Sequence, residues 1–457
     1  MKRETVYKIV ATTALAGQVM WIPFAAYADQ IPLNTGSVGV HTVRAVADEL
    51  DLNKESEKDV KSWEDMEYKR VENSLSSAEK NVLREYTKNI DEMNRYAKEH
   101  IYAYDYEQDE QFNKSIKEVE KILMKASLPR PMAVYRAETP ETFGFSGDLY
   151  QADHPSTISI EAANKLEEQI VNQTFRVDGY TQNALTSGKN GQNPIILCLH
   201  APAGTHAMLY KPEESADMSV LLKDGYSIQP EKVTIITQQG KEYLKVDATV
   251  VETVDFKDDT AKATEWGKQQ YDVWGNHLTE SQKEDLNGYM RQDYKEINKY
   301  LWEQGPEKNP NPALDEKIQS LEDSLSMQPI PENITAYRRM GAAEFGMDLT
   351  DPAYKFENPE NVKAFQDKWE GQIKDNPGFL STSLSSTKEA AFAPRKFVLR
   401  LNVLKGTEGA YVSVLEGYQN EREVLLNKGY SYKINKITPF IDKGTTRLLI
   451  DATIIQK

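Results

Sequence analysis

The chain has 457 residues and a formal net charge of −16, and charged residues make up 28% of it. Nucleic acids are bound chiefly through Lys and Arg, so this acidic balance argues against non-specific binding of DNA or RNA. The length exceeds what one typical hydrophobic core occupies, which makes two domains the default expectation. A single cysteine, Cys198, excludes an internal disulfide, so the fold must be held together by its cores.

The first residues carry the pattern of a secretory signal peptide. Lys2, Arg3 and Lys8 precede an apolar stretch from Ile9 to Ala26, and the small residues near its end fit a cleavage site. We therefore predict a signal peptide over residues 1–28 and secretion of the rest. A transmembrane anchor is the alternative, but polar residues and a proline interrupt the stretch, and no later segment has the length and apolar character of a membrane span.

The chain repeats itself once, at an offset of about 203 residues. Five segments recur in the same order: Trp63 as Trp266, SLSSAEKNVLREY as HLTESQKEDLNGY, AVYRAETPETFGF as TAYRRMGAAEFGM, VLLKDGYSI as VLLNKGYSY, and YLKVDATVV as LLIDATII. Such ordered similarity is the signature of an internal duplication. We therefore predict two diverged copies of one domain, over residues 29–255 and 256–457.

Each copy begins with polar sequence that carries apolar residues at helical spacing, such as Trp63, Met66 and Val71 in the first copy. Short β-rich runs follow, for example PIILCLHA in the first copy and KFVLRLNV in the second. The predicted fold class is α+β, with N-terminal helices followed by a mainly antiparallel β-sandwich core in each domain.

The two copies differ at polar positions, and the second copy holds the richer set. Arg338 and Arg339 stand where the first copy has a single arginine, and Glu421 and Glu423 stand where it has Asp and Ser. The second copy also contains FLSTSLSS, with Ser381, for which the first copy shows no clear counterpart. We therefore expect the chemistry in the second copy.

Elimination narrows that chemistry. Neither His nor Cys occurs after position 277, which excludes a His-based triad, a Cys nucleophile and a Cys/His zinc site in most of the second copy. The carboxylates of Glu421 and Glu423 would share one face of a strand. Two carboxylates facing a sugar carbon suit an oxocarbenium-like transition state. Taken alone, however, a Glu-x-Glu pair equally describes a solvated strand face.

Arg338 answers a different chemical need, because a guanidinium binds phosphate oxygens in bidentate fashion. Considered singly, it also fits an exposed surface arginine, and the STS of FLSTSLSS also fits a polar turn. The occurrence of the arginine, STS and Glu-x-Glu in this order carries the argument.

This ordered trio resembles the catalytic pattern of arginine-specific ADP-ribosylating toxins. The chain after residue 28 further resembles the enzymatic components of iota-type and related binary toxins, including the phrase NPNPALD. The resemblance implies NAD as the substrate, no metal, and transfer of ADP-ribose to an arginine. The roles it implies are these: Arg338, Arg339 and Arg395 hold the NAD phosphates, Ser381 supports Glu423, Glu423 stabilises the ribosyl cation, Glu421 engages the acceptor arginine, Phe392 packs on the nicotinamide, Tyr418 helps recognise the substrate protein, and Tyr289, Tyr294 and Asn298 line the NAD pocket.

The resemblance also implies monomeric host actin as the acceptor, and docking of the first copy onto a separate pore-forming translocation component. The chain would be a monomer when free and would act in the host cytosol after translocation. Gly378 and Ala343 depart from relatives that carry Asn and Gln there, so contacts to NAD are expected to differ. Other interpretations stay open: NAD hydrolysis or a different acceptor, a non-catalytic binding protein, and a glycoside hydrolase, which would leave the arginines and STS unexplained.

Overall fold

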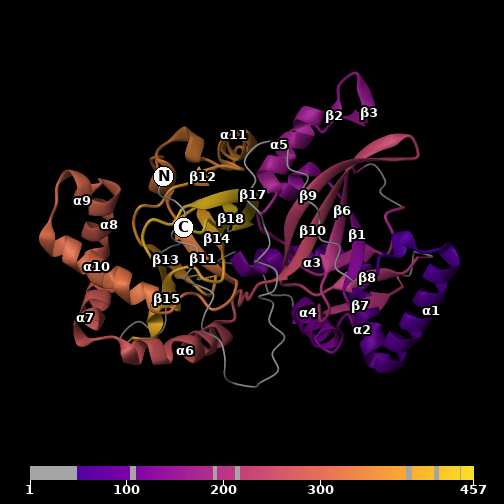
Figure 1. The fold of residues 1–457 in the computed structure, drawn as a ribbon, viewed down its shortest axis with the longest axis horizontal. Coiled ribbons are helices and arrows are strands. Elements are labelled where there is room, and N and C mark those ends of the chain that lie inside the picture. The colour runs from indigo at the N-terminus through magenta and orange to yellow at the C-terminus, as the bar shows by residue number, and fades with distance from the viewer. Residues whose placement is uncertain are drawn as a thin grey trace, which may run out of the picture. The chain divides into compact units, whose positions relative to one another are not determined.

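The computed structural model describes residues 49–102, 110–188, 193–211, 217–386, 394–415, 421–442 and 444–457. The predicted signal peptide lies outside these residues. Within them the chain passes twice from helices to a sheet, which confirms the predicted α+β fold with two tandem domains (Figure 1). We call residues 49–253 the first copy and residues 254–457 the second copy.

The described part of the first copy opens with helices and continues into an eight-stranded sheet of order β4-β9-β10-β6-β1-β5-β8-β7, in which the β6/β10 pair is parallel. The helices are α1 (Glu57–Ser74), α2 (Ser77–Lys88), α3 (Ile90–Tyr102), α4 (Glu110–Leu123) and α5 (Ile160–Ile170). The strands are β1 (Met132–Glu138), β2 (Tyr150–Gln151), β3 (His154–Ile158), β4 (Phe175–Arg176), β5 (Thr181–Ala184), β6 (Ile195–Ala201), β7 (Ala207–Tyr210), β8 (Ser219–Leu222), β9 (Tyr226–Gln238) and β10 (Lys241–Glu252), with β2 and β3 pairing separately.

The second copy repeats this plan, with the sheet order β12-β17-β18-β14-β11-β13-β16-β15 and a parallel β14/β18 pair. Its helices are α6 (Thr260–His277), α7 (Glu280–Gly288), a π-helical turn (Tyr289–Asp293), α8 (Tyr294–Trp302), α9 (Gly305–Lys308), α10 (Pro312–Ser326) and α11 (Pro359–Trp369). Its strands are β11 (Ile334–Met340), β12 (Ile373–Lys374), β13 (Leu380–Ser383), β14 (Phe397–Val403), β15 (Gly409–Tyr411), β16 (Glu423–Leu426), β17 (Tyr432–Asp442) and β18 (Thr445–Ile454).

The same local sequence chemistry starts equivalent helices in the two copies. Ser76 caps α2 through the backbone N–H of Glu79, and the Glu79 side chain accepts from the backbone N–H of Ser76 in return. Thr279 and Gln282 form the same reciprocal capping box at the start of α7. Because a capping box satisfies backbone N–H groups that the first helical turn leaves unpaired, it fixes where each helix begins.

Each copy buries a core of its own. The larger cluster of buried apolar residues lies entirely in the second copy, and the next cluster lies entirely in the first. Strands β6 and β14 are buried along almost their whole length, which explains why PIILCLHA and KFVLRLNV are continuous apolar runs without alternation. Among the described residues, no helix has both the length and the apolar character that crossing a bilayer requires.

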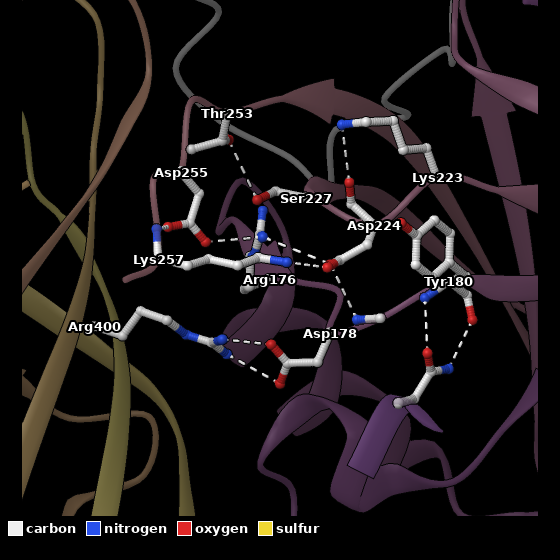
Figure 2. Close-up of polar contacts among 12 residues, drawn as sticks. Arg176, Asp178, Tyr180, Lys223, Asp224, Ser227, Thr253, Asp255, Lys257 and Arg400 are labelled. Carbon is white, nitrogen blue, oxygen red and sulfur yellow. Dashed lines mark hydrogen bonds and ion pairs between the residues drawn. The ribbon is translucent and has the colours of Figure 1, made fainter. Parts of the chain in front are cut away.

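Charged side chains join the two copies, as Figure 2 shows. The guanidinium of Arg400 on β14 forms a paired contact with the carboxylate of Asp178, and Lys257 pairs with Asp224. Arg176 Nη2 lies 2.9 Å from Asp255 Oδ2, and both side chains are almost fully buried. Removing one partner of a buried pair leaves an uncompensated charge, so these contacts tie the copies together specifically.

Candidate active site

Strand β11 carries the arginine that the sequence singled out. Arg338 Nη1 donates to the backbone carbonyl of Ser381 at 2.9 Å, and its Nη2 donates to Glu344 Oε1 at 3.0 Å. Its Nε is buried and has no hydrogen-bond partner among the described residues. The guanidinium is therefore held in place by two contacts and keeps one donor available to a ligand.

Arg339, the next residue on β11, lies on the opposite side of the strand, because successive side chains of a strand alternate. It is only 4% exposed. Arg395 Nη1 donates to the Arg339 carbonyl at 2.8 Å, so these two predicted phosphate ligands are neighbours. Their role at the NAD phosphates stays a prediction.

Strands β13 and β16 bring the serine and the glutamate together. Ser383 lies opposite Glu423 in the antiparallel register, and Ser381 is two residues further along the same strand. Glu423 is 6% exposed. Burial raises its pKa to about 7, the Ser381 hydroxyl that hydrogen-bonds to it and the nearby Arg338 oppose the rise, and the Glu421 charge adds to it. Arg338, Ser381 and Glu423 thus converge on one place, as the ordered motif indicated.

Glu421 does not lie on the strand that the sequence reasoning assumed. Strand β16 begins only at Glu423, and Arg422 has a left-handed backbone with φ of +52°. The argument from strand alternation is therefore wrong, since a left-handed residue interrupts the extended backbone. Glu421 is exposed and lies in a turn, yet it remains close enough for its charge to raise the pKa of Glu423.

An aromatic frame flanks this trio. Asn298 Nδ2 donates to the Tyr289 hydroxyl at 3.0 Å, and Asn298 Oδ1 accepts from the backbone N–H of Phe379 at 3.1 Å. The rings of Tyr289 and Phe379 meet edge to face, with centroids 5.3 Å apart. Tyr294 is 40% exposed, with its ring centroid 6.5 Å from that of Tyr289. Sequence reasoning found these residues except Phe379, whose signal was an aromatic residue directly before the STS.

The first copy retains the same frame. Tyr86 donates from its hydroxyl to Asn94 Oδ1 at 2.9 Å, and the Asn94 amide donates to the Tyr180 carbonyl at 2.8 Å. The rings of Tyr86 and Tyr180 meet edge to face at 5.2 Å. The catalytic positions differ, however: register places Gln182 where the second copy has Ser381, and Ser219 where it has Glu423.

This register corrects one sequence-based interpretation. FLSTSLSS does have a counterpart in the first copy, the segment YTQNALTS from residue 180. The match was missed because only the Leu and the final Ser are identical, whereas strand pairing with β8 fixes the equivalence directly.

Gly378 is part of the aromatic frame. A Cβ built on Gly378 would lie 2.6 Å from Asn298 Oδ1, so a side chain there would have to displace Asn298. In the first copy, Gly179 approaches Asn94 in the same way. The glycine therefore belongs with the position of Asn298 in this chain. Ala343 lies in a short 3-10 turn beside Glu344.

Two predicted site residues, Phe392 and Tyr418, lie outside the described residues. Among the described residues, the one group of potential metal ligands is in the first copy: Cys198, His200 and Asp247. Lys245 Nζ donates at 2.6 Å to the same Asp247 oxygen that faces His200, so an ion would have to displace an ammonium group. The expected absence of a metal from the reaction stays a prediction.

Comparison with known proteins agrees with this geometry. The chain matches the model of the ADP-ribosyltransferase exoenzyme family twice, over residues 60–253 and 263–457, and it belongs to that family. Its catalytic pattern lies within the second match.

Two solved structures and one curated relative are particularly similar. The ADP-ribosylating toxin BECa of a binary enterotoxin of C. perfringens, solved with NADH, is 37% identical, with a TM-score of 0.79 over 87% of this chain and 97% of its own. The enzymatic component C2-I of the C2 toxin of Clostridium botulinum is 28% identical, with a TM-score of 0.74 over 89% of this chain and 99% of its own. A mono-ADP-ribosyltransferase C3 of Clostridium botulinum C phage is 28% identical over 199 residues, which are 43% of this chain and 78% of the relative.

Proposed function

We propose that the second copy transfers ADP-ribose from NAD to an arginine of a host protein, with monomeric actin as the acceptor. The chain would be the secreted enzymatic component of a binary toxin, and the first copy would dock onto a separate translocation component. The convergence of Arg338, Ser381 and Glu423, with a second carboxylate close by, carries this proposal.

Arg338 suits the diphosphate of NAD. Its guanidinium is oriented by the Ser381 carbonyl and by Glu344, and its buried Nε retains a free donor. A guanidinium fixed in this way loses little rotamer freedom when it binds phosphate oxygens. The frame of Tyr289, Asn298 and Phe379 would then hold the nicotinamide-ribose end beside Glu423.

Glu423 suits stabilisation of the ribosyl cation. Its carboxylate is almost fully buried, and a negative charge at low local dielectric interacts strongly with a developing oxocarbenium ion. The bond between the ribose C1′ and the nicotinamide nitrogen breaks, and its electron pair leaves with the nicotinamide. Glu423 accepts a hydrogen bond from the ribose 2′-hydroxyl in its ionised form, while Ser381 fixes the carboxylate.

Glu421 suits the second half of the reaction. Because it is exposed, it can meet a protein side chain that the buried Glu423 cannot reach. A carboxylate there would pair with the acceptor guanidinium and take up the proton that its nitrogen loses on bonding to C1′. The same carboxylate distinguishes transfer to arginine from simple hydrolysis of NAD by water.

The proposed reaction is tested by mapping the acceptor. Purified monomeric actin would be incubated with NAD and the mature chain, and its peptides would then be analysed by mass spectrometry. We expect one ADP-ribose per actin, attached to an arginine. An adduct on another residue type would exclude arginine specificity, and nicotinamide release without any adduct would favour a hydrolase or a different acceptor.

The pH dependence of the reaction should follow the ionisation of Glu423. Its pKa of about 7 means that kcat/KM for NAD consumption falls as the pH drops through about 7, because the protonated acid cannot stabilise a cation. Ser381→Ala removes a bond to the ionised form and should shift the midpoint to higher pH. Glu370→Gln is the control, since the pKa of Glu370 is also raised to about 7 but its carboxylate binds the Ile437 N–H. A wild-type midpoint near pH 4.5 would contradict the assignment.

The docking role of the first copy is testable by competition. A fragment of residues 49–253 contains a complete core, and it should reduce uptake of the whole chain when both are added with the translocation component. The matched competitor is a fragment of residues 254–457, for which no effect on uptake is expected. Competition by the second fragment alone would reverse the assignment of the two copies.

A further inference from the structure

Arg422 adopts a backbone conformation that side-chain-bearing residues rarely adopt. Its φ of +52° lies in the left-handed region, which glycine adopts freely and other residues adopt at a cost. Among the described residues, four other non-glycine residues have a positive φ: Asn172, Gln239, Lys257 and Gln304. Arg422 differs from them because it joins the two carboxylates of the candidate site. Unfavourable backbone conformations that persist at such sites are held by their surroundings.

The surroundings that hold Arg422 are visible on both sides of it. The backbone N–H of Leu384 donates to the Arg422 carbonyl at 3.0 Å, and Arg422 Nε donates to Ser385 Oγ at 3.0 Å. The Ser383 hydroxyl donates to the Glu421 carbonyl at 3.0 Å. The segment after the predicted STS therefore binds the backbone directly before the buried glutamate.

The far side of the same turn is fixed as well. The backbone N–H of Glu423 donates to Ser413 Oγ at 2.8 Å, and Ser413 is 1% exposed. The direction in which Glu423 enters the core is thus set by a buried hydroxyl. A turn with hydrogen bonds to all three of its residues has little freedom to relax into an extended strand.

This turn separates the environments of the two carboxylates. An extended residue between them would place both side chains on one face of the strand. With the left-handed residue in between, Glu423 is buried and Glu421 is exposed. The two groups can then act on different partners, one on the bound sugar and the other on a molecule that approaches from solvent.

The first copy provides an internal comparison. Register places Met218 and Ser219 where the second copy has Arg422 and Glu423. Met218 is 6% exposed, and it does not appear among the residues with a positive φ in the described chain. The left-handed turn is therefore present in the copy with the glutamates and absent from the copy without them.

We propose that Arg422 is a positioning residue whose left-handed backbone, held by the Ser383–Ser385 segment, separates the acceptor-facing Glu421 from the ribose-facing Glu423. This inference rests on the proposed function, because it assigns the two carboxylates to two steps. The turn should therefore matter more for transfer to a protein arginine than for cleavage of NAD.

Substitutions that differ in their tolerance of a positive φ test this inference. Arg422→Gly and Arg422→Asn tolerate the left-handed region, whereas Arg422→Ala and the β-branched Arg422→Val do so poorly. We expect the ratio of actin modification to NAD hydrolysis to stay within about threefold of wild type for Gly and Asn. It should fall by about tenfold for Val, with Ala between, since the left-handed conformation costs roughly one factor of ten.

The ratio separates positioning from folding, because a partly unfolded enzyme loses both activities together. If Arg422→Val does not fold, as judged by circular dichroism, the comparison of Asn with Ala carries the test. Equal ratios in all folded variants would overturn the inference, as would a large loss in Gly alone. A wild-type chain that neither releases nicotinamide nor modifies actin would remove the proposed function, and this inference with it.

Discussion

Glu423→Gln should lower nicotinamide release and ADP-ribose transfer by roughly a thousandfold or more. Glutamine keeps the size of the side chain and can still accept from Ser381, but it carries no charge to stabilise an oxocarbenium ion. Steady-state release of nicotinamide from labelled NAD, with and without actin, measures both activities. Ser219→Ala in the first copy is the matched control, since Ser219 occupies the equivalent strand position and should leave both rates unchanged.

Loss of the fold would not explain such a result. Burial raises the pKa of Glu423 from 4.5 to about 7, so the stability that the protonated acid contributes is lost as the pH rises through about 7. Glutamine removes that penalty, and at about 1.4 kcal/mol per pKa unit the variant should gain roughly 2 kcal/mol of unfolding free energy near pH 8. An inactive but more stable variant would support the assignment. Near-normal turnover would remove Glu423 from its role.

Glu421→Gln should separate the two halves of the reaction. We expect transfer to actin to fall by roughly a hundredfold, because the acceptor guanidinium loses the carboxylate that pairs with it and takes its proton. NAD hydrolysis should remain within about tenfold of wild type, since the buried Glu423 still stabilises the ribosyl cation and water can capture it. Parallel measurement of nicotinamide release and labelled actin gives both rates from one reaction.

The first copy offers the control for this variant as well. Asp217→Asn changes the acidic residue at the equivalent place in the duplicated sequence and should affect neither rate. If Glu421→Gln reduced hydrolysis and transfer by the same factor, the proposed division between the two glutamates would fail. Unchanged transfer would show that another group engages the acceptor.

Much of the architecture was readable from the sequence because a duplication shows itself at many positions at once. The repeated S/T-x-x-E/Q boxes begin equivalent helices, and the paired apolar runs form equivalent buried strands. The convergence of Arg338, Ser381 and Glu423 also followed from the ordered motif. Residues far apart in the chain meet there because β11, β13 and β16 are neighbours in the sheet.

The features that were missed depend on backbone geometry rather than on residue type. Nothing in the letters EREVLL indicates that Arg422 has a positive φ, so strand alternation was assumed where a turn occurs. The role of Phe379 depends on its backbone N–H, which Asn298 binds, and a backbone group leaves no signature in the side chains. The close approach of Gly378 to Asn298 is likewise a matter of distance, which only the fold determines.

The most direct test of this account is incubation of the mature chain with labelled NAD and purified monomeric actin, following nicotinamide release and label on actin together. The account predicts that wild type releases nicotinamide and labels actin in equal amounts, whereas Glu423→Gln does neither. Absence of both signals from a folded wild-type chain, or equal signals from wild type and Glu423→Gln, would contradict it.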